Sequence, residues 1–222
     1  MGMPFETSEE VVTAGNMQAK QATVSHAFGG MAVQFILFTS VEAGVALLDE
    51  RRRGIWKRLR TAPLSRLTLL AARVISGSII ALFVTCVVFG FGAIVFGIRV
   101  QGGSAGIFGF LAVAGSYALM AATFGLLIAA LGKTPQAARG VSILAVLVMV
   151  MLGGEWVPSQ FFPPWVRALT PVVPTRWAVD GFDAATVRAN SVAEMLGPVA
   201  AILGFAALFG VLALARFRWE AE

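Results

Sequence analysis

Charged residues are scarce in this chain of 222 residues: they make up 13% of it, whereas a soluble domain carries about a quarter. Hydrophobic residues make up 58%, and the mean hydropathy is +0.82. Cysteine, histidine and tyrosine occur once each, as Cys86, His26 and Tyr117. A single cysteine excludes a disulfide framework and a multi-cysteine metal site within one chain. The composition therefore indicates a protein whose main solvent is lipid.

The sequence also lacks the converging polar groups that an enzyme acting inside a membrane requires. His26 precedes the first apolar segment, and Glu42 is the one acid clearly inside such a segment. The Gly-Lys-Thr tripeptide at 132–134 resembles the end of a phosphate-binding loop, but Leu127 stands where that loop needs glycine. We therefore expect no catalytic residue, no metal site and no bound cofactor. Because the basic residues lie between apolar segments, we also expect no nucleic-acid partner.

Five apolar segments approach the length of about 20 residues that a helix needs to cross a bilayer. They predict an all-α polytopic membrane bundle over residues 26–222, preceded by a polar lead segment over residues 1–25. The lead segment is acidic and lacks the pattern of a cleavable signal peptide. The predicted spans are residues 28–48, 74–98, 107–131, 137–154 and 195–215.

The orientation follows from the distribution of lysine and arginine, which remain on the cytoplasmic side of short loops. The segment Asp49–Arg66 is the most basic part of the chain, so we place it in the cytoplasm. Five crossings then put the N-terminus outside and the C-terminus inside the plasma membrane. The basic residues of this segment are Arg51, Arg52, Arg53, Lys57, Arg58, Arg60 and Arg66.

An ionisable side chain within a span is costly and marks a functional site by default. Glu42 lies seven residues before Asp49, close to the cytoplasmic end of the first predicted span. It could pair with the arginines that follow, or with Arg73 at the start of the next span. Two interpretations remain open, a structural ion pair and a role in substrate binding or gating.

The segment from Glu155 to Asn190 is too rich in proline for a continuous spanning helix. Its aromatic side chains favour the membrane interface. We predict short broken or re-entrant helices at the extracellular face, where they would form a gate; a cap lying on the surface is the alternative. The prolines are Pro158, Pro163, Pro164, Pro171 and Pro174, and the aromatic residues are Trp156, Phe161, Phe162, Trp165 and Trp177.

The basic segment Asp49–Arg66 also has an amphipathic pattern, since Ile55, Trp56 and Leu59 share one helical face. It predicts a short helix at the inner membrane surface. Such a helix could lie on anionic lipid or dock on a cytoplasmic partner, and the pattern alone does not choose between them.

Two stretches resemble the membrane subunits of ATP-binding-cassette (ABC) exporters of the type-2 permease class, ABC-2, and with the spacing of the helices the resemblance covers about residues 25–219. The first stretch is Asp49-Glu50-Arg51-Arg52-Arg53-Gly54-Ile55-Trp56-Lys57-Arg58-Leu59-Arg60-Thr61-Ala62-Pro63-Leu64-Ser65. The second runs from Gly153-Gly154 through Pro158, Pro163-Pro164-Trp165, Pro171, Pro174 and Trp177 to Asp180.

The resemblance implies a function for each stretch. The basic segment would be the coupling helix, which seats in a cytoplasmic ABC ATPase subunit that binds ATP and magnesium. By this analogy the ATPase contact would be formed by Glu50, Gly54, Trp56, Leu59 and Pro63. The extracellular gate would contain Pro158, Pro164, Trp165, Pro171, Pro174, Trp177 and Asp180. Arg52 and Ile55 depart from the family pattern, and this bears on which ATPase is accepted.

The resemblance further implies a permease for efflux, of bacterial origin, that pairs with a second and identical permease subunit in the lipid bilayer. The family has six spans, whereas five are visible here, so we expect a shorter relative or a fragment without the first helix. An accessory scaffold that moves no substrate is an alternative function. A secondary transporter driven by an ion gradient is a further alternative. It is weakened because Glu42 is the one buried titratable residue that could serve such a mechanism. The substrate is not encoded in any motif.

Overall fold

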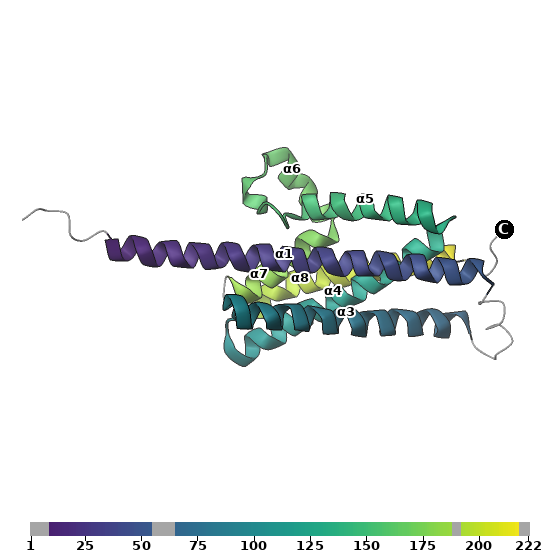
Figure 1. Ribbon diagram of the computed structural model, residues 1–222, viewed down its shortest axis with the longest axis horizontal. Coiled ribbons are helices and arrows are strands. Elements are labelled where there is room, and N and C mark those ends of the chain that lie inside the picture. The colour runs from purple at the N-terminus through teal and green to yellow at the C-terminus, as the bar shows by residue number, and fades with distance from the viewer. Residues whose placement is uncertain (1–8, 55–64, 188–191, 218–222) are drawn as a thin grey trace, which may run out of the picture.

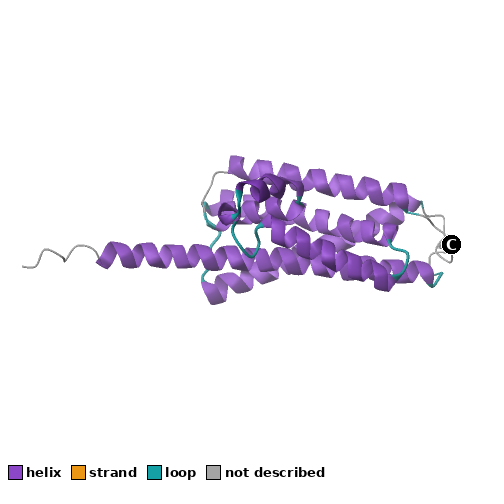
Figure 2. Ribbon diagram, turned by 90° about the horizontal axis from the view of Figure 1, so that it is seen from above, coloured by secondary structure: helices purple, strands orange, loops and turns teal. Residues whose placement is uncertain are grey.

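A computed structural model describes residues 9–54, 65–187 and 192–217, with side chains from Ala22 onward except those of Arg66, Gln160 and Val192. Within these ranges the chain is helical and contains no strand. Five of the described helices are long and apolar enough to cross a membrane. The predicted polytopic helical bundle is thus confirmed (Figures 1 and 2).

The first helix, α1, runs without interruption over Glu9–Arg52. It begins inside the segment interpreted as a polar lead, so residues 9–25 continue directly into the first candidate span, Ala22–Arg52. In both ribbon views the N-terminal part of α1 projects beyond the rest of the bundle (Figures 1 and 2).

The other spanning helices run back and forth between two ends of the bundle. α4 (Gly103–Leu131) is central and packs against α1, α3 (Arg66–Phe96) and α8 (Val192–Arg216), while α5 (Pro135–Gly153) packs mainly on α1. We call the end where α1 finishes and α3 begins the basic end. The opposite end, which carries the segment between α5 and α8, is called the proline-rich end (Figure 1).

Small residues allow α1 and α4 to approach closely. A Cβ atom added at Gly125 would lie 2.6 Å from the carbonyl oxygen of Ser40, and one added at Gly44 would collide with the carbonyl of Gly125. In lipid, helix association depends on such van der Waals contact, because the hydrophobic effect does not drive helices together there. Glycine at this crossing therefore fixes α1 against the central helix.

The segment between α5 and α8 folds into the short broken helices that the prolines predict. In order these are η1 (Ser159–Phe161), α6 (Pro164–Leu169), η2 (Thr170–Val172) and α7 (Pro174–Thr186). Three of them carry proline in the first turn, where its missing N–H costs no helical hydrogen bond. α6 has no buried residue, whereas α7 is largely buried among α1, α4, α5 and α8.

An aromatic cluster holds α7 inside the bundle. Phe182 on α7 is 1% exposed, and its ring stacks on Phe89 of α3 at a centroid distance of 4.9 Å. Phe110 and Tyr117 of α4 complete the contact. The segment is therefore anchored in the core of the bundle through α7 and is not a cap lying wholly on the surface.

The predicted coupling helix needs a correction at its boundaries. Asp49–Arg52 is the last turn of α1, because neither glycine nor proline stands between Gly44 and Gly54 to end the helix earlier. Ser65 caps the N-terminus of α3, where its Oγ accepts a hydrogen bond from the backbone N–H of Thr68 at 3.1 Å. Residues 55–64, which include Trp56, Leu59 and Pro63, lie outside the described residues.

Candidate functional site

The basic end joins four spanning helices around the last turn of α1. Glu50 forms an ion pair with Arg73 of α3. The guanidinium of Arg51 donates to the carbonyl oxygen of Ala129 in α4 at 3.4 Å and lies over the ring of Phe217, just after α8. A displacement at this turn would therefore reach α3, α4 and α8 together.

Gly54 sets the direction in which the backbone leaves the C-terminal end of α1. Its φ is +74°, a left-handed conformation that side chains with a Cβ rarely adopt. Its N–H donates to the carbonyl oxygen of Arg51 at 3.2 Å, and a Cβ added there would meet no atom of the described residues within 4 Å. Backbone conformation, and not space, is therefore what requires glycine. Of the predicted ATPase contacts, Glu50 and Gly54 are the two whose positions the structure describes.

The Gly-Lys-Thr tripeptide lies at this end but is a turn between two helices. Gly132 caps the C-terminus of α4, and Thr134 caps α5, with its Oγ accepting from the N–H of Ala137 at 3.3 Å. A phosphate-binding loop follows a strand, whereas this turn follows a spanning helix. The structure thus agrees with the sequence-based rejection of that motif.

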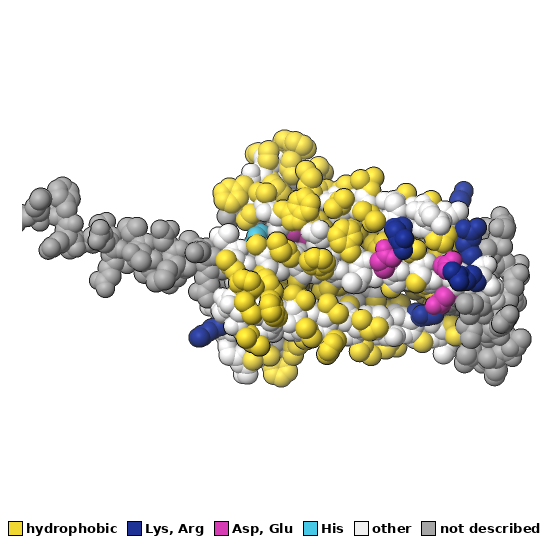
Figure 3. All heavy atoms as spheres, in the orientation of Figure 1, with side chains coloured by type: hydrophobic (Ala, Val, Ile, Leu, Met, Phe, Trp, Pro, Cys, Tyr) yellow, Lys and Arg dark blue, Asp and Glu magenta, His cyan; other side chains and the backbone are white. Residues whose placement is uncertain are grey.

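Glu42 forms an ion pair, but with a different partner from those considered. Its carboxylate accepts from Arg139 of α5 at 2.6 Å, while Arg73 is bound to Glu50. The partner was not foreseeable, because it depends on α5 packing beside α1. The side chains of Glu42 and Arg139 are 55% and 50% exposed, so this pair lies on the outer surface of the single chain. Charged side chains gather toward this end in Figure 3.

The predicted gate residues lie in or beside the short helices of the proline-rich end. Pro158 precedes η1, Pro164 opens α6, Pro171 lies in η2 and Pro174 opens α7. Trp165 is 70% exposed on α6.

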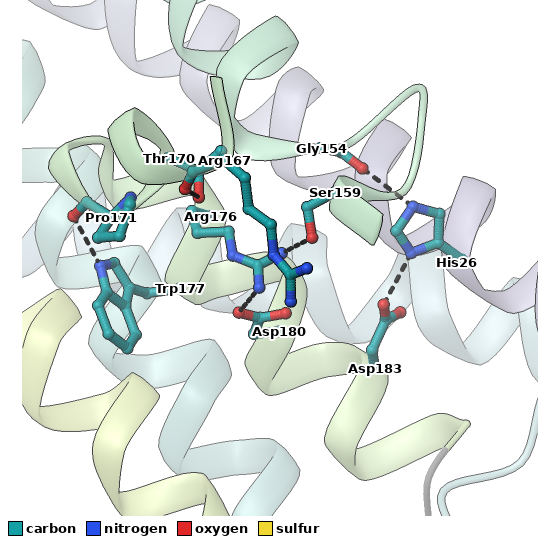
Figure 4. A network of polar contacts seen from close by, with 10 residues as sticks. All are labelled: His26, Gly154, Ser159, Arg167, Thr170, Pro171, Arg176, Trp177, Asp180 and Asp183. Atoms are coloured by element: carbon teal, nitrogen blue, oxygen red, sulfur yellow. Dashed lines mark hydrogen bonds and ion pairs between the residues drawn. The ribbon is translucent and has the colours of Figure 1, made fainter. Parts of the chain in front are cut away.

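The two remaining gate residues make specific contacts within this segment. The indole N–H of Trp177 donates to the carbonyl oxygen of Pro171 at 3.0 Å, which ties α7 to η2. Asp180 pairs with Arg176 one turn earlier on α7, at 2.9 Å. Arg176 also donates to Ser159 of η1 (Figure 4). The structure therefore brings the predicted set together at one end of the bundle.

A polar pocket of about 480 Å³ opens beneath η1 and α6, between α1 and α7. Its wall includes an interaction that the sequence did not indicate: His26 of α1 faces Asp183 of α7, with 2.7 Å between Nδ1 and Oδ2 (Figure 4). The charged or ionisable side chains of the pocket are His26, Arg167, Arg176, Asp180 and Asp183.

The turn after α5 lies along one stripe of α1. Nε2 of His26 contacts the carbonyl oxygen of Gly154 at 3.0 Å, and the indole N–H of Trp156 donates to the side chain of Gln34 at 2.9 Å. Between them, a Cβ at Gly30 would lie 2.5 Å from the carbonyl oxygen of Glu155. The spacing of His26, Gly30 and Gln34 is four residues each time, which places them on one helical face. Residues 154, 155 and 156 therefore pack in that order along this stripe of α1.

The sequence did not reveal several of these polar residues. His26 and Asp183 are 157 positions apart, and Glu155 seemed only to close the fourth span, although its side chain is 1% exposed. One local signal existed: Arg176 and Asp180 are spaced i,i+4 just after Pro174, as expected for an ion pair in the first turns of a helix.

The profile of the ABC-2 type transporter family matches residues 7–187. This chain belongs to that family. The resemblance predicted from the two stretches is thereby confirmed, and the chain is an ABC-2 membrane subunit with a membrane-spanning bundle.

Three curated proteins are similar to this chain over part of their length. The linearmycin resistance permease protein LnrN of Bacillus subtilis (strain 168) is 27% identical over 179 residues, which are 81% of this chain and 46% of LnrN. The putative transport permease YvfS of the same organism is 26% identical over 72% of this chain and 64% of YvfS. The daunorubicin resistance ABC transporter permease protein DrrB1 of Streptomyces coeruleorubidus is 21% identical over 65% of this chain and 51% of DrrB1. The chain thus spans less than two thirds of each relative.

Proposed function

We propose that this chain is the transmembrane permease subunit of an ATP-driven exporter. A separate cytoplasmic ABC ATPase hydrolyses ATP, and the chain couples that hydrolysis to efflux of a substrate. The family match supports the transport role, and the names of two relatives, both resistance permeases, support efflux. The substrate class is not part of the proposal, because fold and family do not define a site for it.

The observation that carries the coupling proposal is the construction of the basic end. The described chain beyond α1 ends at Gly54 and resumes at Ser65, the cap of α3, so residues 55–64 connect these two helix ends. At that point Glu50 and Arg51 connect α1 to α3, α4 and the end of α8. An ATPase that pulls on this segment would move those helices together. The proposal places this end in the cytoplasm, in accord with the positive charge there.

The pair Glu42–Arg139 supports a path between two permease subunits. A half-exposed ion pair within spanning helices would be costly against hydrocarbon. The exposed stripe of α1 that bears Glu42 also carries Met31, Phe35 and Thr39, a mixture of apolar and polar side chains. We therefore place the face of α1 and α5 toward a second, identical subunit, with the substrate path between them.

This placement predicts that Glu42 can be neutralised at small cost. Between water-accessible side chains an ion pair contributes up to about 1 kcal/mol, whereas removing one partner of a dry pair costs about 3–5 kcal/mol. We expect Glu42→Gln and Arg139→Gln each to lower the free energy of unfolding in bicelles by less than about 1 kcal/mol. The charge-swapped double variant should restore the stability. Losses of about 3–5 kcal/mol would instead show that this face is buried in a dry environment.

At the proline-rich end, the short helices would form the exit gate. Binding of ATP would close the ATPase pair, pull on residues 49–65 and favour an outward-open arrangement of the spans. Nucleotide can shift this equilibrium only by binding one conformation more tightly. α6, which has no buried residue, could move without unpacking the core.

The test is the ATPase rate of a candidate cytoplasmic ATPase reconstituted with this chain in liposomes. Stimulation that Trp56→Ala removes, with membrane insertion unchanged, supports coupling through residues 49–65. Orthovanadate should then abolish transport, whereas sensitivity to collapse of the proton gradient alone would indicate a secondary transporter. An ATPase that neither binds nor responds to the inserted protein would favour a scaffold without transport activity.

A further inference from the structure

Glu155, the second residue after α5, has an unusual environment for a carboxylate. Its side chain is 1% exposed. Both carboxylate oxygens are buried, and neither has a hydrogen-bond partner among the residues that the structure describes. Its backbone is fixed against α1 at Gly30, and its N–H lies 3.4 Å from the carbonyl oxygen of Val150. The buried position is therefore set by backbone packing and not by any bond of the carboxylate.

The ionisable groups on the surrounding elements already have partners. The hydroxyl of Tyr117 on α4 donates to the carbonyl oxygen of Val33 at 2.7 Å. His26 on α1 is engaged by Asp183 and by the carbonyl of Gly154. Arg176 on α7 is engaged by Asp180 and Ser159. His26 and Arg176 thus serve other groups, and no cation among the described residues forms an ion pair with Glu155.

An ionised carboxylate without donors or a counter-ion is expensive to bury, so the neutral acid is the form that fits. Burial raises the pKa of Glu155 from 4.5 to about 9. At neutral pH the closed turn therefore holds a proton on this side chain.

We propose that Glu155 is a proton-binding site of the proline-rich end: it is filled while residues 154–156 are docked on α1, and it is emptied when that turn opens and exposes the carboxylate. The proton site follows from the packing of this chain alone. Its consequence for transport, one proton released for each opening of the exit, rests on the proposed function. The ligand is a proton, and the reaction is dissociation of the carboxylic acid to a carboxylate.

The sign of the pH dependence follows from linkage. The closed state binds one more proton than the open state between the ordinary pKa of 4.5 and the raised value of about 9. The open population should therefore rise about tenfold for each pH unit within that window. Acid favours the docked turn and alkali favours its release.

The first test is infrared spectroscopy of the whole chain in nanodiscs after labelling with ¹³C-glutamate. At pH 7 we expect the carbonyl stretch of a protonated, labelled glutamic acid. The band should be absent from Glu155→Gln and retained in Glu42→Gln, the matched control. Should Glu155→Gln fail to insert, titration of the wild type decides, because an acid at its ordinary pKa loses the band well below pH 7. Absence of the band at pH 7 in the wild type would overturn the proposal.

The second test follows opening directly, by hydrogen exchange of a peptide covering residues 150–162, corrected for the chemical exchange rate. We expect opening to increase with pH in the wild type and in His26→Gln, and to lose this dependence in Glu155→Gln. A dependence that persists in Glu155→Gln and disappears in His26→Gln would assign the proton to the histidine and reject Glu155. Neither measurement requires an ATPase, so a failure of the proposed coupling would be separate from a failure of the proton site.

Discussion

Replacing Gly54 by proline is expected to abolish stimulation of the partner ATPase while the bundle still inserts. Gly54 has a φ of +74°, whereas proline is fixed near −65°. Proline also removes the N–H that donates to Arg51. Proline would therefore change the direction of the backbone where it leaves the end of α1. The expected loss is the whole coupling free energy, which is typically about 1–3 kcal/mol. The measurement is the ATPase rate in liposomes that contain equal amounts of inserted protein.

Gly54→Asn is the matched control for this prediction. Asparagine enters the left-handed region more readily than other residues with a Cβ, and no described residue comes within 4 Å of a Cβ at Gly54. We therefore expect Gly54→Asn to keep most of the stimulation. Equal loss in both variants would show that glycine is needed here for contact with a partner and not for chain direction. Full stimulation in Gly54→Pro would exclude this turn from coupling.

Replacing Gly30 by alanine should destabilise the proline-rich end strongly, although it adds only one methyl group. The added Cβ would lie 2.5 Å from the carbonyl oxygen of Glu155 and 3.1 Å from its carbonyl carbon and its Cα. Because these are backbone atoms, no side-chain rotation relieves the overlap. We expect a loss of about 1–3 kcal/mol, as for other overpacked sites. Thermal unfolding in nanodiscs and hydrogen exchange of residues 150–162 measure it.

Gly29→Ala is the control, since it adds the same atom to the adjacent position of the same helix. Its Cβ would meet only side-chain atoms of Phe182 and Phe89, both at 3.9 Å, which is ordinary contact. We expect its unfolding midpoint to equal or slightly exceed that of the wild type, because alanine favours a helix over glycine. Similar midpoints for the two variants would mean that α1 is not packed against the turn after α5 in the membrane.

The five spans were predictable because a bilayer imposes a length and an apolar composition on any helix that crosses it. The structure extends several of them: α3 begins at Arg66 and not at residue 74, and α1 continues through residues predicted to form a separate coupling helix. Composition does not predict such helix boundaries, because a helix continues into polar sequence until a residue such as Gly54 ends it.

Within the candidate site, the sequence indicated the positions that depend on local chemistry. The prolines marked the broken helices that follow residue 158, whereas the sequence did not predict that α1 continues through the basic turn and ends just before Gly54. It did not reveal the partner of Glu42, which proved to be Arg139, nor the pair His26–Asp183. These contacts join helices that are distant in the chain, so no local pattern encodes them.

The sequence by itself determined that this protein is a bundle of membrane-spanning helices with one basic end and one broken, proline-rich segment. Hydropathy, charge and proline act through neighbouring residues, and so they remain visible in a linear chain. Only the tertiary structure decided which charges are paired and that the carboxylate of Glu155 is buried without a hydrogen-bond partner among the residues it describes. The ionisation of that group depends on which helices close around it, and this is a property of packing in three dimensions.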